Sequence, residues 1–163
     1  MIVYHGSIEI IKNPDVIHSK KYLDFGQGFY LTTFENQAKK WAARKGMRQK
    51  KTPIVNVYEM SEEWQNLKVL SFEKENEEWL DFVCACRKGE PLNKEYDIII
   101  GNVADDDVFK TVDMYFRGLW DKKKVLSELR YYKMNNQICI VNQETLNRLL
   151  TYQNSYEVKC DGR

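Results

Sequence analysis

The sequence has little histidine and no excess of charge of either sign. Only His5 and His18 occur among 163 residues, and they lack the His-x-x-x-His spacing of a helical zinc site, so we expect no metal centre. Lys and Arg number 25 and Asp and Glu number 24, which leaves a net charge of +1. A nearly neutral chain has no overall field that would draw it onto nucleic acid or an anionic membrane. Any contact with nucleic acid must then come from a local patch.

Long apolar runs and paired cysteine motifs are also missing. The longest apolar stretches, such as residues 82–86, are far shorter than the roughly 18 residues that cross a bilayer. The first ten residues show neither the basic nor the apolar region of a secretion signal, so we expect a cytoplasmic protein with no membrane contact. The four cysteines form no Cys-x-x-Cys motif, and we interpret them as reduced thiols of the core.

What is present is the composition of a folded domain. Apolar residues make up 43% and charged residues 30% of the chain, which excludes a disordered or low-complexity protein. The length corresponds to a single domain over residues 1–163. Period-2 and short apolar segments predict strands over 2–4, 28–31, 54–58, 67–70, 96–100, 137–141 and 156–159. Helical periodicity and caps predict helices over 32–45, 75–87, 105–116, 125–132 and 142–150. Residues 10–25 show no clear period and predict a long loop, either a lid or a binding loop.

The positions of the glycines argue against the familiar nucleotide-binding folds. Gly26-Gln27-Gly28 precedes a predicted strand, whereas the glycines of a dinucleotide-binding fold follow a strand and open a helix. The Gly-x-x-x-x-Gly-Lys-Ser/Thr pattern of an NTPase P-loop is missing. Three other segments occur in a distinctive order. They are Tyr4-His5-Gly6-Ser7, then Phe25-Gly26-Gln27-Gly28-Phe29-Tyr30-Leu31-Thr32-Thr33, then Asn136-Gln137-Ile138-Cys139-Ile140.

Together these segments resemble the three motifs of the His-Tyr-Glu class of ADP-ribosyltransferases, typified by the poly(ADP-ribose) polymerases. In that class a His-Gly-Ser/Thr ends one strand, a Gly-x-Gly-Ile-Tyr-Phe lies on a second, and a catalytic Glu lies at the start of a third. Within the class the sequence looks closest to a bacterial family of small, uncharacterised and diverged proteins. The resemblance spans residues 1 to about 150. It implies an α+β fold in which a split, antiparallel-rich pair of sheets is flanked by helices, whereas the patterns alone also allow an α/β fold.

The resemblance also implies a site for NAD, bound as co-substrate without a metal. His5 would bind the ribose hydroxyls of NAD, and the backbone of Gly6, next to Ser7, would pair with the nicotinamide carboxamide. A small residue at position 6 lets ligand and backbone approach closely. Tyr30 and Trp41 would stack on the two faces of the nicotinamide ring, where each face contributes on the order of 1 kcal/mol.

Two positions depart from the pattern of the class. Ala38 stands where the class has a serine that binds the carboxamide oxygen, so that contact is lost or supplied by another group. Gln137 stands at the catalytic Glu, and it keeps a hydrogen bond to the ribose 2′-hydroxyl without the negative charge that stabilises an oxocarbenium-like transition state. Gln137→Glu is therefore expected to raise NAD cleavage. Asp105 and Asp106 are candidates for a substitute charge or for positioning the acceptor, and helix capping is the alternative interpretation.

The function that the resemblance implies is transfer of ADP-ribose from NAD to a macromolecule with release of nicotinamide. Such a bacterial enzyme would be a toxin or effector, for which an antitoxin is a possible partner. One alternative is a non-catalytic module that binds NAD or ADP-ribose. Another is modification of nucleic acid instead of a protein acceptor, for which the support is a basic cluster formed by Arg44, Lys45, Arg48, Lys50 and Lys51.

Overall fold

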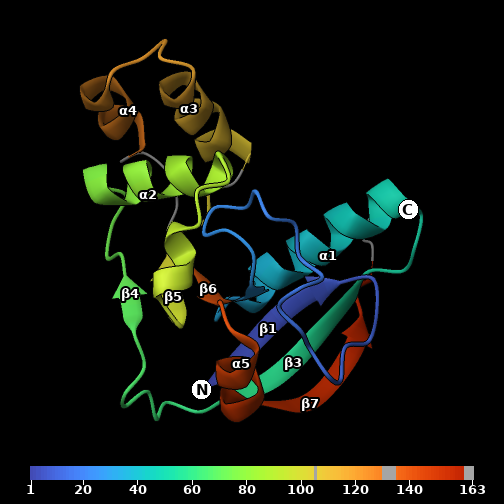
Figure 1. Ribbon diagram of the computed structural model, residues 1–163. Helices are drawn as coiled ribbons and strands as arrows, with labels where there is room; N and C mark the ends of the chain where they lie inside the picture. Colours follow the sequence, from blue (N-terminus) through green and yellow to red (C-terminus); the bar gives the residue numbers. More distant parts are fainter. Residues whose placement is uncertain (105, 130–134, 160–163) are drawn as a thin grey trace.

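Two β-sheets and the helices around them form the expected α+β fold (Figure 1). The computed structural model describes residues 1–104, 106–129 and 135–159. The strands are β1 (Ile2–Ser7), β2 (Phe29–Leu31), β3 (Ile54–Met60), β4 (Val69–Ser71), β5 (Ile98–Gly101), β6 (Gln137–Ile140) and β7 (Leu150–Glu157). The helices are α1 (Glu35–Gln49), α2 (Glu77–Arg87), α3 (Asp106–Phe116), α4 (Lys122–Leu129), α5 (Gln143–Leu149) and the short 3-10 helix η1 (Leu92–Glu95).

The sheets are almost entirely antiparallel, as expected. The first has the strand order β1-β3-β7 and the second the order β2-β6-β5-β4, in which β4 and β5 are the parallel pair. The two sheets meet where β1 passes the end of β2, since Tyr4 and Thr32 exchange backbone hydrogen bonds of 2.9 and 3.0 Å. This junction brings the first two motifs side by side. The strand expected over 156–159 is replaced by a longer strand, β7, which begins directly after α5 at Leu150 and ends at Glu157.

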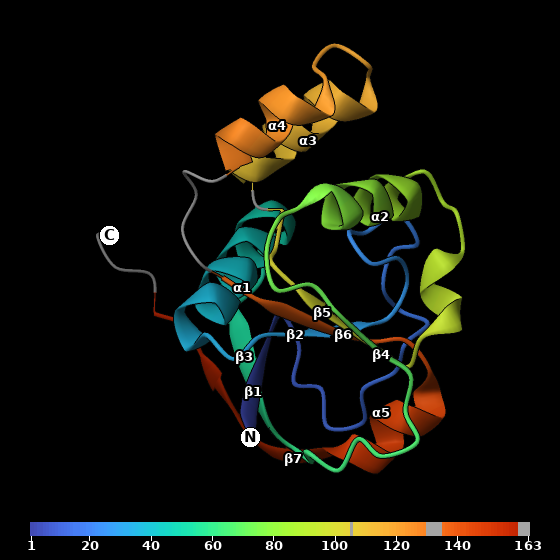
Figure 2. The same cartoon turned by 90° about the vertical axis from the view of Figure 1, so that its left-hand side faces the viewer.

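The four-stranded sheet is buried on both faces. Alternate residues of a strand point to opposite sides, and Ile138 and Ile140 of β6 pack in the core between the two sheets. Cys139 and Ile99 point the other way, into a core that includes Trp79 of α2. Figure 2 shows α2, α3 and α4 on one side of this sheet and α5 with β7 on the other. In the described part of the chain, no helix has the length and apolar character needed to cross a membrane.

Helix α1 begins later than its sequence pattern predicts. The Thr32–Glu35 spacing predicts a capping box, but the helix begins at Glu35 and its N-cap residue Phe34 makes no side-chain cap. Thr32 Oγ1 instead accepts a hydrogen bond of 3.1 Å from the Phe34 amide and donates one of 2.8 Å to Asn136 Oδ1. A tertiary partner thus takes the hydroxyl that the local pattern assigns to the cap. The same bond ties the end of β2 to the start of β6, where the third motif lies.

Candidate functional site

His5 lies near the end of β1 with its ring held on two sides. The ring stacks on Phe29 with centroids 4.3 Å apart, and Nδ1 lies 2.6 Å from the carbonyl oxygen of Tyr30. Because a carbonyl only accepts, Nδ1 carries the proton and Nε2 of the neutral ring is an acceptor. Burial is the main cause that lowers the pKa of His5 to about 3; the charge of Lys45 adds to it, and the Tyr30 carbonyl opposes it. His5 is therefore neutral across the physiological pH range.

The second ring nitrogen of His5 is open to a ligand. No described residue forms a hydrogen bond with Nε2, and no buried side-chain nitrogen or oxygen of the described residues lacks a partner. Nε2 is therefore accessible. A fixed and neutral acceptor at an accessible position suits a hydroxyl donor better than an anion or another acceptor.

Gly6 is required for the close approach of helix α1 to strand β1. A Cβ atom on Gly6 would lie 2.2 Å from the carbonyl oxygen of Ala38 and 2.7 Å from the amide nitrogen of Ala42. The small residue is thus explained by packing between helix and strand, in addition to the ligand approach that the sequence predicts. The half-buried Trp41 lies beside it, because the same Cβ would be 2.9 Å from Trp41 Cβ. Ser7 follows as a buried residue at the end of β1.

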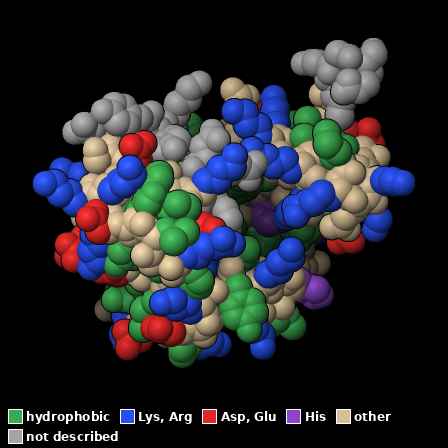
Figure 3. Space-filling model, turned by 90° about the horizontal axis from the view of Figure 1, so that it is seen from above, with side chains coloured by type: hydrophobic (Ala, Val, Ile, Leu, Met, Phe, Trp, Pro, Cys, Tyr) green, Lys and Arg blue, Asp and Glu red, His purple; other side chains and the backbone are tan. Residues whose placement is uncertain are grey.

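Lys45 turns from the basic cluster toward this end of β1. Its Nζ donates a 3.1 Å hydrogen bond to the carbonyl oxygen of Gly6, the residue whose backbone the resemblance assigns to the carboxamide. Burial lowers the pKa of Lys45, and the charges of Arg48 and Lys20 add to this effect. None of the ion pairs of the described residues gives Lys45 an acidic partner. Figure 3 shows one recessed histidine on the upper face of the molecule, with Lys and Arg side chains gathered around it.

Tyr30 uses its hydroxyl to hold the turn before β2. The hydroxyl donates to the Gly26 carbonyl at 2.5 Å and accepts from the Phe25 amide at 3.0 Å. Burial is the main cause that raises the pKa of Tyr30 well above its ordinary value. Among the ring contacts of the described residues, none joins Tyr30 to Trp41. The pair that the sequence predicts as a ring clamp therefore stays a prediction.

Gln137 begins β6 and is almost fully buried, with 3% of its surface exposed. Its Nε2 donates to Asp24 Oδ2 at 2.9 Å and to the backbone oxygen of Asn102 at 3.3 Å. The Asp24 carboxylate also pairs with Arg87 of α2, whose Nε lies 2.9 Å from Oδ1, and accepts the Ala104 amide at 2.9 Å. Sequence analysis missed Asp24. The one signal that could have found it is its position directly before the Phe-Gly-x-Gly segment.

The candidate acidic residues after β5 cannot be placed in the site. Asp105 lies outside the described residues, and Asp106 begins α3 with a side chain that also lies outside them. Their proposed part in positioning an acceptor stays a prediction. The neighbouring backbone amide of Ala104 is placed, and it donates to Asp24.

The site residues form two halves, one beside Phe29 and one beside Tyr30, whose side chains point to opposite faces of β2. The first, which we call the His5 half, contains His5, Gly6, Trp41 and Lys45, and Phe29 of β2 packs on it. The second, the Gln137 half, contains Gln137, Asp24, Arg87 and the side chain of Tyr30. Tyr30 joins the two halves, because its carbonyl binds His5 while its side chain points toward the α2 side of the sheet. The structure thus brings together all three motifs around one residue of β2.

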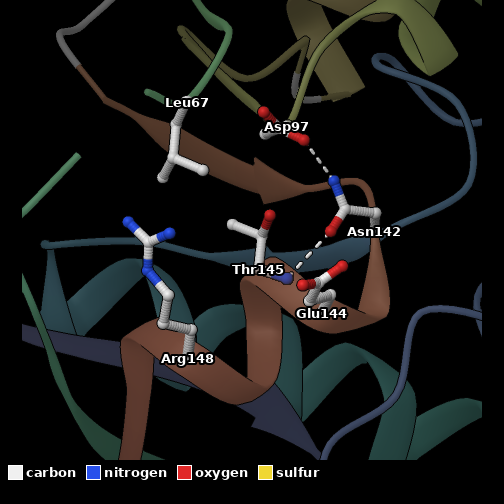
Figure 4. Close-up of a pocket in the computed structure, with 6 residues that line it drawn as sticks. All are labelled: Leu67, Asp97, Asn142, Glu144, Thr145 and Arg148. Atoms are coloured by element: carbon white, nitrogen blue, oxygen red, sulfur yellow. Dashed lines mark hydrogen bonds between the residues drawn. The ribbon is translucent and has the colours of Figure 1, made fainter. Parts of the chain in front are cut away.

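A separate pocket of about 300 Å³ lies at the start of α5, away from the three motifs (Figure 4). Asn142 lies between two partners there, since its side chain donates to Asp97 and accepts from the Thr145 amide at 2.8 Å. Arg148 from the same wall donates to the Glu63 carbonyl at 3.1 Å. The contact between Asn142 and the Thr145 amide is the N-cap of α5. Nowhere in the described residues do three or more His, Cys, Asp or Glu side chains form a group that could hold a metal ion.

Comparison with known families identifies a match over most of the chain. Residues 1–152 match a family described as a protein of unknown function, DUF3990. The chain belongs to the DUF3990 family. The matched region includes both halves of the site, from His5 to Gln137. No curated protein matches the chain, so the function of this DUF3990 protein has to be argued from the site itself.

Proposed function

We propose that this DUF3990 protein binds NAD at the site formed by the two halves and transfers its ADP-ribose to a macromolecule, releasing nicotinamide. The observation that carries the proposal is a pair of anchored acceptors, His5 Nε2 and Gln137 Oε1. In each side chain the protein occupies the other polar atom, and no described residue binds the acceptor itself. Two fixed acceptors match the hydroxyl donors of ribose, which NAD carries in two copies.

The charge of the His5 half supports the same ligand. Lys45 lies beside His5, with Arg48 and Lys20 close enough to lower its pKa. A half-buried ammonium group without an acidic partner among the described residues is suited to an anion, because the anion offsets the cost of burying the charge. The diphosphate of NAD supplies that anion. The split, antiparallel-rich pair of sheets, which the resemblance implies for an ADP-ribosyltransferase-like fold, is further support.

Each residue then has a limited chemical role. In the transfer, the bond between ribose C1′ and the nicotinamide nitrogen breaks and its electron pair leaves with nicotinamide, while the acceptor adds to C1′ and loses a proton. Gln137 Oε1 orients the reacting ribose by accepting a hydroxyl hydrogen bond. His5 Nε2 does the same for a second hydroxyl, and Trp41, whose Cβ lies beside Gly6, would stack on the nicotinamide ring. The chain supplies mainly orientation, which is one of the larger contributions to enzymatic rate.

A second candidate function is binding of NAD or ADP-ribose without catalysis. It is favoured by the neutral amide of Gln137, which retains a hydrogen bond but not the charge of a carboxylate. The two functions differ in one outcome: a transferase releases nicotinamide and a binding module does not.

The acceptor would meet a positive surface at the end of α1. Arg48, Lys50 and Lys51 are exposed there, whereas Lys45 of the same cluster is turned toward Gly6. An acceptor that carries phosphates, such as nucleic acid, would gain from these charges, and its binding would weaken with salt. A neutral protein acceptor would show no such dependence.

The proposal is tested by incubating purified protein with NAD and measuring nicotinamide release. His5→Ala is expected to lower the rate at least tenfold, because it removes one of the two hydroxyl acceptors. His18→Ala is the matched control, since His18 is exposed and its ring binds Asp15 on the surface. NAD binding without release in the wild type would establish the binding module. Neither binding nor release, or an equal loss in both variants, would refute the site.

A further inference from the structure

We propose that Asp24 is a positioning residue that fixes the Gln137 amide so that its oxygen, and not its NH2 group, faces the substrate. The inference rests on the proposed function for the identity of the substrate, and on the geometry of the Gln137 half for everything else. It explains how an amide can stand at the position where the class has a carboxylate.

Only the Nε2 end of the Gln137 amide forms hydrogen bonds with described residues. A glutamine amide has two donor hydrogens on Nε2 and an acceptor on Oε1. Nε2 has two partners, Asp24 Oδ2 at 2.9 Å and Asn102 O at 3.3 Å. Oε1 has no hydrogen-bond partner among the described residues. Every fully buried side-chain oxygen of these residues has a partner. Oε1 is therefore the polar atom of this side chain that is unpaired and not fully buried, in a residue with 3% of its surface exposed.

The opposite orientation of the amide is disfavoured by both partners. The two ends of an amide differ only in which groups they can bind, so the network decides between them. Turning the amide would bring Oε1 against the Asp24 carboxylate and against the Asn102 carbonyl, both of which only accept. It would also present a donor, in place of an acceptor, to the ribose hydroxyl.

Asp24 itself cannot turn away, because three other parts of the chain hold it. Arg87 of α2 binds Oδ1, and the Ala104 amide, from the segment between β5 and α3, binds Oδ2 at 2.9 Å. Gln137 of β6 shares Oδ2. The Asp24 side chain is only 8% exposed, and hydrogen bonds to a buried carboxylate are strong in such surroundings.

This arrangement assigns Asp24 an orienting role and not a chemical one. Both carboxylate oxygens are occupied by protein groups, so Asp24 acts on a substrate only through Gln137. Its negative charge is balanced by Arg87, which leaves little net charge to act at a distance. The orientation of the amide is then what Asp24 contributes.

A double-mutant cycle measures this role in NAD cleavage. Asp24→Asn keeps the shape but can place an NH2 group against Gln137 Nε2, which favours the turned amide. We expect kcat to fall about tenfold, the effect of one misplaced hydrogen bond, with a smaller change in KM. In the Gln137→Ala background the same substitution should leave kcat unchanged. Equal losses in both backgrounds would show a merely structural role and overturn the inference.

The matched control is Asp97→Asn. Asp97 also accepts hydrogen bonds, from the Lys68 amide and from Asn142, but at the opposite end of the four-stranded sheet. It should leave kcat within twofold of the wild type. A tenfold loss in this variant as well would show that kcat responds to the loss of any hydrogen-bonded aspartate, and the inference would fail.

A second readout needs neither NAD nor activity, so it separates this inference from the proposed function. In an NMR spectrum the side-chain NH2 signals of Gln137, identified by their loss in Gln137→Ala, should exchange slowly with solvent and change on Asp24→Asn but not on Asp97→Asn. Unchanged signals in Asp24→Asn would overturn the inference. If Asp24→Asn does not fold, the wild type decides: a scalar coupling across the hydrogen bond from Gln137 Nε2 to Asp24 Cγ supports the inference, and its absence refutes it. A wild type with this coupling but no NAD cleavage or binding would refute only the proposed function.

Discussion

The two halves of the site present the same kind of atom, an accessible acceptor, but they hold it by opposite means. In the His5 half an ionisable ring is kept neutral by burial and by the charge of Lys45, and one backbone carbonyl fixes its tautomer. In the Gln137 half a group that cannot ionise is fixed by a buried ion pair, Asp24 with Arg87. The His5 half is therefore sensitive to pH and to nearby charge. The Gln137 half is sensitive to the removal of a single partner.

The largest expected effect is the loss of the ion pair in the Gln137 half. Asp24→Ala removes the carboxylate that binds Arg87, Ala104 and Gln137, and breaking a buried pair from one side costs about 3–5 kcal/mol. Denaturant unfolding should show this decrease in the free energy of unfolding. Glu62→Ala, an exposed acidic control, should change it by less than about 0.5 kcal/mol. If Asp24→Ala lowers the free energy of unfolding by as little as the control does, the ion pair does not stabilise the Gln137 half.

The next largest effect is expected for Gln137→Glu, which adds a charge at position 137 with little change in side-chain size. Gln137→Glu would place a second carboxylate at the 2.9 Å contact with Asp24, and like charges at this distance raise the pKa of one of the two groups, although Arg87 opposes the rise. A group with a raised pKa stabilises the fold below its unfolded pKa, and this stability is lost as pH rises through the folded value. Relative to the wild type, the variant should lose about 2 kcal/mol between pH 5 and pH 8.

The sequence predicts faster NAD cleavage for Gln137→Glu, and the network changes that expectation. The gain should appear only in the double variant Asp24→Asn/Gln137→Glu, where an amide again faces a carboxylate. Gln65→Glu, at an exposed position, is the control for an added charge. If the stability of Gln137→Glu does not depend on pH and this variant cleaves NAD faster, the side chain at position 137 does not contact Asp24.

The His5 half should respond to acid. Its folded pKa of about 3 lies below the ordinary histidine value of 6.5, so folding excludes the proton. The stability is complete above pH 6.5 and decreases as pH falls toward 3. The expected loss is about 1 kcal/mol per pH unit in this window. Unfolding experiments at pH 7, 6 and 5 should show a steeper decrease in the wild type than in His5→Gln. His18→Gln should keep the wild-type slope, and an equal slope in all three proteins would argue that His5 is not desolvated.

The smallest expected effect concerns the cation of the His5 half. Lys45→Met keeps the length of the side chain and removes a charge that lowers the pKa of His5, so the pKa of His5 should rise. NAD affinity should fall a few-fold through loss of one phosphate contact. Lys50→Met, at the exposed end of the same cluster, should change neither quantity. NMR titration of the His5 ring and calorimetry measure both, and identical results for the two variants would place Lys45 outside the site.

Much of the fold could be predicted because it depends on local pattern. The short apolar segments around β1, β3, β5 and β6 are recognisable from their own residues. His5, Tyr30 and Gln137 became site candidates through the resemblance of their segments to three motifs of a known class, and their roles stay predictions. The predicted strand over 156–159 was partly wrong, because much of β7 is an exposed edge whose polar residues give no apolar run.

What could not be predicted depends on partners distant in sequence. Asp24 lies in a segment without a period, and its partners Arg87, Ala104 and Gln137 are 63, 80 and 113 residues away. The capping box at Thr32 failed because Asn136, 104 residues on, takes the hydroxyl. Such contacts leave no spacing in a single sequence, so only the structure shows them.

The most direct test of the account is an NMR titration with NAD in which the ring nitrogens of His5 and the side-chain amide of Gln137 are followed together. If ribose hydroxyls bind both acceptors, both sets of signals should shift with the same dissociation constant. Free nicotinamide, which has no ribose, should leave them unchanged. NAD that shifts neither His5 Nε2 nor the Gln137 amide would contradict the claim that the two halves form one NAD site.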